Sequence, residues 1–125
     1  VVTASYFEFS RPNDVDLPEK EWRHGLHGGA IETAMMLHLR PDLVRQEALQ
    51  TFPSLGQELE GTLACLGPEG PPSFAWLAGD LNPLGATGDA TLATADIGAR
   101  LVTHYGQVLA DVVQDARRFP IDRLV

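Results

Sequence analysis

The sequence has a single cysteine and no long run of apolar residues. Cys65 has no partner with which to form a disulfide bond inside the chain. No apolar run approaches the roughly 20 residues that span a lipid bilayer, so the sequence predicts no membrane-spanning helix and no membrane partner. The first residues also do not resemble a signal peptide, and we therefore expect a cytoplasmic protein.

Positive charge is scarce as well. The chain has 9 Lys and Arg against 17 Asp and Glu, and its formal net charge is −8. Nucleic-acid binding depends on cations that neutralise phosphates, so this balance argues against nucleic acid as a partner. The sequence has neither an internal repeat nor a low-complexity tract. Because 125 residues with 44% apolar content can bury one core but hardly two, we expect residues 1–125 to form a single unit.

What the sequence does contain is a stretch rich in histidine and glycine, WRHGLHGGAIETAMMLHLR, over residues 22–40. It leads into a predicted helix whose first turn holds Glu32. Three glycines just before that helix can adopt positive φ or permit close contacts, namely Gly25, Gly28 and Gly29. Such a turn would hold the side chains of His27 and Glu32 next to each other.

Predicted strands and helices alternate along the first half of the chain. Residues 1–9 are rich in β-branched and aromatic residues, which predicts a strand. Residues 10–28 are predicted to form a loop that carries His24 and His27, with His24 in solvent. Apolar residues three and four positions apart predict a helix over residues 30–40, interrupted by Pro41. Residues 42–49 add one or two helical turns.

The second half begins with a connector over residues 50–72, where the density of Gly and Pro precludes a long regular element. Residues 73–78 then predict a short strand. Asp89 is predicted to cap a long helix that ends before Pro120, with Gly98 and Gly106 permitting close packing along it. We expect His38 on or beside the buried face of its helix, and His104 on a solvated helix side. Strands that alternate with helices favour an α/β fold with a largely parallel sheet.

Three separated segments carry a resemblance to one enzyme family. Residues 27–34, HGGAIETA, resemble the His-Ala-Gly-Glu-x-Glu-Thr-Ser segment of the creatininase (creatinine amidohydrolase) family. Residues 39–45, LRPDLVR, resemble the run that follows it there, and residues 80–98 resemble the family's Gly-x-x-Gly-Asp-x-x-x-Ala-Thr element before the last helix. The sequence departs from the family pattern at Ala30, where many members carry Glu, and at Ala34, where Ser is usual.

The resemblance implies a three-layer α/β/α fold and a metal-dependent amidohydrolase. It implies that Glu32 is a ligand of a divalent metal, zinc or manganese or also iron, and that His27 is a catalytic acid or base. It further implies that Trp22, Gly28 and Gly29 lie near the substrate, a cyclic amide, a formamide or a short peptide. Purely structural roles for Glu32, His27 and Trp22 are also compatible with the sequence. Glu32 could simply favour the helix dipole, His27 could be an ordinary loop histidine, and Trp22 could anchor the loop to the core.

Two metal-binding segments of the family, Glu-x-His-Gly and Gly-His-Gly-Gly-Asn, do not occur in this sequence. We therefore expect the chain to be the C-terminal half of a creatininase-like protein, lacking most of the metal ligands. A small sheet with uncovered edges favours association with an N-terminal half or with copies of the chain as a homo-oligomer. Two alternatives are a non-catalytic assembly module that keeps the family packing, and a binding protein that uses the glycine turn for an anion. The net negative charge of the chain disfavours binding of an anion at this turn.

Overall fold

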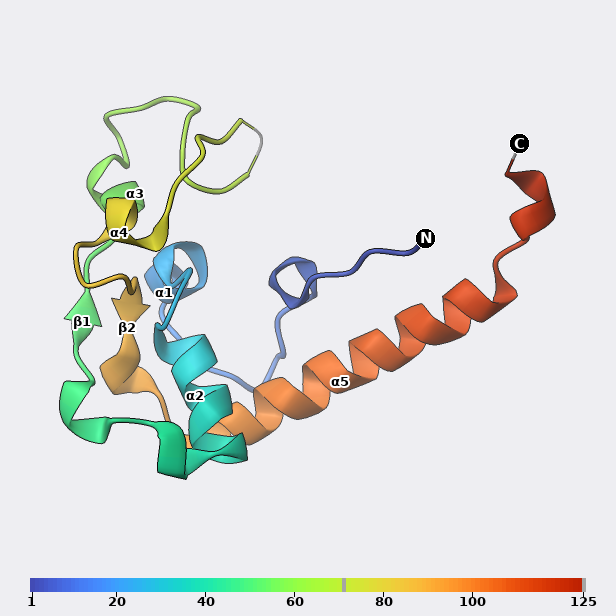
Figure 1. Cartoon of the computed structure of the whole chain (residues 1–125), viewed down its shortest axis with the longest axis horizontal. Helices are drawn as coiled ribbons and strands as arrows, with labels where there is room; N and C mark the ends of the chain where they lie inside the picture. Colours follow the sequence, from blue (N-terminus) through green and yellow to red (C-terminus); the bar gives the residue numbers. More distant parts are fainter. Residues whose placement is uncertain (71, 125) are drawn as a thin grey trace.

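The computed structural model describes residues 1–70 and 72–124. Its helices are α1 (Glu19–His24), α2 (Ala30–Leu39), α3 (Leu55–Glu58), α4 (Ala78–Leu81) and α5 (Ala95–Arg118), and its strands are β1 (Thr51–Phe52) and β2 (Gly88–Asp89). Short 3-10 helices lie at Tyr6–Glu8, Pro41–Leu43, Gln46–Ala48, Ala90–Leu92 and Ile121–Arg123. Figure 1 shows the two strands beside α1 and α2, and the first turns of α5 against α2, while the second half of α5 extends away from them. Within the described residues, no helix has the length and apolarity needed to cross a membrane.

The α/β prediction holds only in part, because the described residues are mostly helical. Their one sheet has two strands, which pair antiparallel with Thr51 opposite Asp89 and Phe52 opposite Gly88. The prediction of a largely parallel sheet is therefore wrong for this part of the chain. The connector over residues 50–72 holds only short elements, as predicted, and Pro71 lies outside the described residues.

Neither of the two predicted strands forms. Residues 1–9 are irregular apart from the 3-10 helix Tyr6–Glu8, and residues 73–77 form no strand. A strand needs a neighbouring strand to bind its backbone groups. Among the described residues, the second segment has only one isolated bridge, between Ser73 and Gly67. Side chains of both segments find other partners instead. The Trp76 indole donates to the carbonyl of Pro68 at 2.8 Å, and Tyr6 packs against Tyr105 of α5.

Helix α2 confirms the helix predicted over residues 30–40, and its end at Leu39 precedes Pro41 as expected. The turns predicted over residues 42–49 are present as two 3-10 helices. The loop predicted over residues 10–28 is wrong in one respect, since Glu19–His24 forms α1 inside it. This helix begins directly after Pro18, which is its N-cap residue and has an extended ψ of 144°.

Helix α5 starts five residues after the predicted position, with its cap at Thr94 instead of Asp89. Asp89 caps only the 3-10 helix Ala90–Leu92, through a hydrogen bond from the backbone N–H of Thr91. The long helix is capped by Thr94, whose hydroxyl accepts from the backbone N–H of Ile97 at 3.2 Å. The two helices are separate because the 3-10 helix ends at Leu92 and the backbone of Ala93 is extended, with a ψ of 133°. The predicted end is confirmed, with α5 closing at Arg118 before Pro120.

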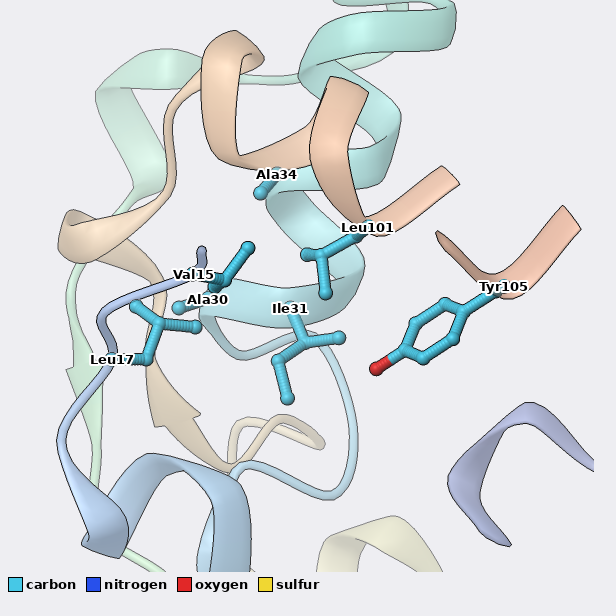
Figure 2. Close-up of a cluster of buried hydrophobic side chains, with 7 residues drawn as sticks. All are labelled: Val15, Leu17, Ala30, Ile31, Ala34, Leu101 and Tyr105. Atoms are coloured by element: carbon cyan, nitrogen blue, oxygen red, sulfur yellow. The ribbon is translucent and has the colours of Figure 1, made fainter. Parts of the chain in front are cut away.

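The core lies between α2, the first turns of α5 and the chain that precedes α1 (Figure 2). Its buried apolar residues are Val15, Leu17, Ala30, Ile31, Ala34, Leu101 and Tyr105. Gly98 lets α2 and α5 approach closely, because a Cβ at this position would overlap the carbonyl of Ala34. The same expectation is wrong for Gly106, where a Cβ would meet nothing within 4 Å. Further along α5, Leu109 and Val113 are exposed.

Replacing each of the two glycines of α5 by Ala is expected to change the free energy of unfolding in opposite directions. Gly98→Ala forces a methyl group against the Ala34 carbonyl, and we expect it to lower the free energy of unfolding by about 1–3 kcal/mol. Gly106→Ala adds a methyl group to an open position and should raise that free energy by about 1 kcal/mol through helix propensity. Urea denaturation followed by circular dichroism measures both. Equal effects of the two substitutions would show that α2 and α5 do not pack through Gly98.

Candidate functional site

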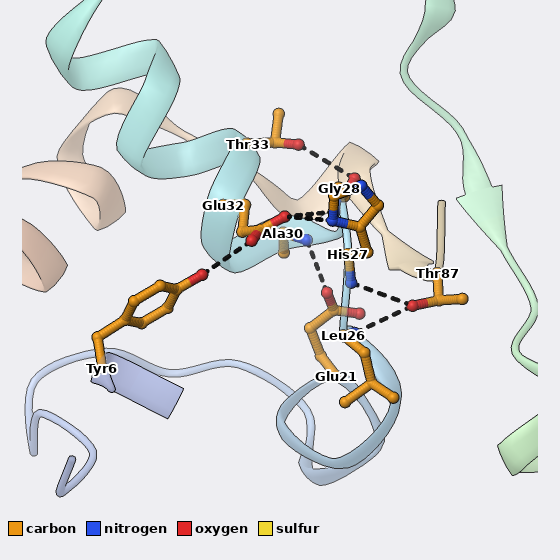
Figure 3. Close-up of polar contacts among 9 residues, drawn as sticks. All are labelled: Tyr6, Glu21, Leu26, His27, Gly28, Ala30, Glu32, Thr33 and Thr87. Atoms are coloured by element: carbon orange, nitrogen blue, oxygen red, sulfur yellow. Dashed lines mark hydrogen bonds and ion pairs between the residues drawn. The ribbon is translucent and has the colours of Figure 1, made fainter. Parts of the chain in front are cut away.

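The turn before α2 brings together the two residues that the sequence singled out. The imidazole Nδ1 of His27 lies 3.5 Å from Glu32 Oε2, which confirms that the two side chains are neighbours. Gly28 adopts a φ of 67°, a left-handed conformation that glycine permits at little cost. The backbone N–H of Gly28 donates to the same Glu32 oxygen at 2.6 Å. Glu32 therefore braces the turn that carries His27 (Figure 3).

The other oxygen of Glu32 has a partner that the sequence did not reveal. The hydroxyl of Tyr6 donates to Glu32 Oε1 at 2.8 Å. Burial, together with the hydrogen bond and the negative charge of Glu32, raises the pKa of Tyr6 well above its usual value. The phenol is therefore protonated at neutral pH, as a hydrogen-bond donor must be. No motif marked Tyr6, because residues 1–9 were interpreted as a strand.

A buried carboxylate, Glu21, stands behind the turn. Its side chain is among the most enclosed in the molecule, with 2% exposure. One oxygen accepts from the backbone N–H of Ala30 at 2.6 Å, and the other accepts from the backbone N–H of Asp89 at 2.7 Å. Glu21 thus links the start of α2 to β2. Nothing in the sequence distinguished it from the charged residues around it.

Three glycines, Gly25, Gly29 and Gly88, lie against the Glu21 carboxylate, where a side chain would not fit. A Cβ at Gly88 would lie 2.6 Å from Glu21 Oε1, and a Cβ at Gly25 or Gly29 would overlap the same oxygen. The predicted need for glycine at positions 25 and 29 is therefore explained by close packing rather than by positive φ. Gly29 is buried against this carboxylate.

Thr87 fixes the backbone of the turn from the opposite side. Its hydroxyl accepts from the backbone N–H groups of Leu26 and His27 at 3.0 and 3.2 Å. Its own N–H donates to the carbonyl of His27 at 2.7 Å. Thr87 has 0% exposure, so these bonds are shielded from water. The His27 backbone is thus held rigidly while its imidazole stays exposed.

The remaining candidates lie on either side of this turn. Trp22 packs against the core, and it also lines an open hollow of about 760 Å³ between α1 and residues 56–70. Gly28 and Glu32 line a different hollow, of about 320 Å³, whose wall includes Met36 and Phe52. The side chain of Trp22 and the turn therefore border two separate hollows in this structure.

Two of the other histidines depart from the prediction. His24 was expected in solvent but is 7% exposed, because α1 turns it inward, where its Nε2 lies 3.1 Å from Glu60 Oε1. His104 is half-buried rather than fully solvated, and its Nε2 lies 2.6 Å from the carbonyl oxygen of Ser10. His38 is exposed beside the buried face of α2, as expected.

The donor atoms at the turn do not make a complete metal site. His27 and Glu32 offer one nitrogen and one carboxylate, whereas hydrolytic zinc sites use three protein ligands. Across residues 1–70 and 72–124, no group of three or more His, Cys, Asp or Glu side chains is placed to hold a metal ion. What the turn does present is an imidazole beside a carboxylate at the surface, an arrangement suited to proton transfer.

Comparison with known proteins gives one match. The family model described as creatininase, creatinine amidohydrolase, matches residues 1–113. The match includes Tyr6, Glu21, the turn before α2 and most of α5. No curated protein and no solved structure matches the chain.

Proposed function

The chain belongs to the creatininase family, and from this premise we propose that it contributes to the hydrolysis of a C–N bond by a metal-dependent amidohydrolase. The substrate class is a cyclic amide, a formamide or a short peptide. The observation that carries the proposal is the contact of 3.5 Å between His27 and Glu32 on an exposed turn. The turn lies inside one of the three segments that resemble the family.

His27 is the proposed acid or base. Its imidazole is exposed, so it can exchange protons with a substrate and with water, while Thr87 holds its backbone and Glu21 holds the start of α2. Imidazole is suited to this task because its pKa in model peptides lies near neutral pH. In the proposed reaction, His27 hands a proton to the leaving nitrogen as the amide bond breaks.

Glu32 is the proposed metal ligand. The family is metal-dependent, and a divalent ion such as zinc, manganese or iron would supply a bound water of lowered pKa as nucleophile. Since the described residues offer only the pair His27 and Glu32 at the turn, the other ligands of the proposed enzyme would come from segments outside these 125 residues, such as the family's Glu-x-His-Gly. Trp22, Gly28 and Gly29 are the proposed neighbours of the substrate.

The proposed enzyme also needs a partner surface. The apolar residues Leu109 and Val113 are exposed on the second half of α5, which extends beyond the core (Figure 1). Burial of such residues stabilises an association in rough proportion to the apolar area removed from water. We propose that an N-terminal half of the family fold or another copy of the chain covers this face, in a cytoplasmic enzyme.

The pure 125-residue chain should show negligible amidohydrolase activity, even with added zinc or manganese, because two donors cannot fix a catalytic ion. The measurement is product release from a panel of cyclic amides, formamides and short peptides with the metal in excess. The control is the full product of the reading frame, assayed in parallel. Substantial turnover by the pure chain would contradict the proposal that the other metal ligands come from outside these 125 residues.

A second candidate function is a non-catalytic module that keeps the family packing and serves assembly. The shortage of metal donors at the turn favours it. An intact-mass measurement compared with the full reading frame distinguishes the two candidates. A longer product that contains Glu-x-His-Gly supports the enzyme, whereas a 125-residue product without activity supports the module.

A further inference from the structure

Tyr6 lies outside the three segments that carry the family resemblance, yet its hydroxyl reaches the candidate site (Figure 3). It donates to Glu32 Oε1 at 2.8 Å. The second oxygen, Oε2, accepts from the N–H of Gly28 at 2.6 Å and lies 3.5 Å from the imidazole of His27. The two oxygens of Glu32 thus have separate surroundings: one is bound to Tyr6, and the other faces His27.

The position of Tyr6 is itself fixed by α5. Its ring lies 5.5 Å from the ring of Tyr105, and Phe9 packs against the same tyrosine at 6.2 Å between centroids. Ser10, next in the chain, is bound through its carbonyl to His104 at 2.6 Å. The segment before α1 is therefore attached to α5 at several points, and the phenol is held over Glu32 by these contacts.

We propose that Tyr6 is a positioning residue, which holds the Glu32 carboxylate in the orientation that faces His27. Without the hydroxyl, Glu32 keeps only its bond to the turn and can rotate about its terminal torsion, which is broad for carboxylates. Small misplacements of a catalytic pair are costly, since a shift of about 1 Å can lower a rate about 10²-fold. The importance of this orientation for catalysis rests on the proposed function, but the contact itself does not.

Tyr6→Phe removes only the hydroxyl, and Tyr105→Phe is its matched control from the same aromatic cluster. The readouts, at one fixed pH in the 125-residue chain, are the ¹³C resonances of the Glu32 carboxylate and of the His27 imidazole, together with the melting temperature. Tyr6→Phe should move both resonances. Tyr105→Phe should leave both in place, even if it lowers the melting temperature. Unmoved resonances in Tyr6→Phe, or equal shifts in the two variants, would overturn the proposal.

The reciprocal variant protects the test against a Tyr6→Phe chain that fails to fold. Glu32→Gln should move the ring resonances of Tyr6 and leave those of Tyr105 unchanged, and the opposite pattern would overturn the proposal. The two proposals can also fail separately. If Tyr6→Phe moves the Glu32 and His27 resonances while His27 variants keep full hydrolytic activity, the hydrolase assignment fails and the positioning of Glu32 by Tyr6 stands.

Discussion

His27→Asn in the full product of the reading frame is expected to lower amide turnover by about 10²–10⁴-fold, the usual contribution of a proton-transfer group. Asn keeps a polar side chain at the exposed position but cannot exchange a proton near neutral pH. Because the backbone of residue 27 is held by Thr87, the turn should keep its shape in the variant. Metal content, measured on the same samples, should be largely unchanged.

The control for this substitution is His38→Asn, which makes the same change at an exposed histidine of α2 away from the turn. We expect it to leave turnover near that of the wild type. If both variants lose activity equally, the loss reflects damage to α2 and says nothing about proton transfer. If neither loses activity, His27 is an ordinary surface histidine.

Glu21→Gln should lower the free energy of unfolding by about 2–4 kcal/mol. Each oxygen of Glu21 accepts a backbone N–H, from Ala30 and from Asp89. An amide of the same size replaces one of these acceptors with a donor, so a buried N–H would then face an N–H. Hydrogen bonds to charged groups contribute about 1.5–3 kcal/mol each, and a buried group left without its partner adds a desolvation cost.

Urea denaturation of Glu21→Gln beside Glu58→Gln measures this effect. Glu58 is an exposed residue of α3, so its substitution should leave the midpoint close to that of the wild type. A midpoint for Glu21→Gln equal to that of Glu58→Gln would contradict the role assigned to the buried carboxylate. Because Glu21 links the start of α2 to β2, its loss should also broaden the resonances of His27.

Features set by neighbouring residues were predictable from the sequence. Helix α2 follows from apolar spacing and the proline after it, and the contact between His27 and Glu32 follows from their separation across a glycine turn. The end of α5 was predictable for the same reason. Its start was not, because Asp89 and Thr94 both have the chemistry of a helix cap. The extended backbone of Ala93 separates the two caps, and no local pattern marks that break.

The contacts that hold the site come from residues far apart in the chain. Glu21 reaches Asp89 and Tyr6 reaches Glu32, and neither pair forms a local pattern. Residues 1–9 have a composition typical of strands, but composition does not reveal whether a partner strand exists. Tyr6 and Phe9 pack on Tyr105 of α5 instead, and this contact holds Tyr6 next to Glu32.

Metal analysis of the full product with Glu32→Gln tests the central claim most directly, namely that the turn before α2 belongs to a metal-dependent hydrolase site. Gln keeps the size of Glu but lacks the negative charge that favours a divalent cation. We predict that the wild type and His27→Asn carry the same amount of metal, and that Glu32→Gln carries much less and loses its activity. Full metal occupancy in Glu32→Gln, together with undiminished turnover in His27→Asn, would contradict the account and leave Glu32 as a residue that only braces its own turn.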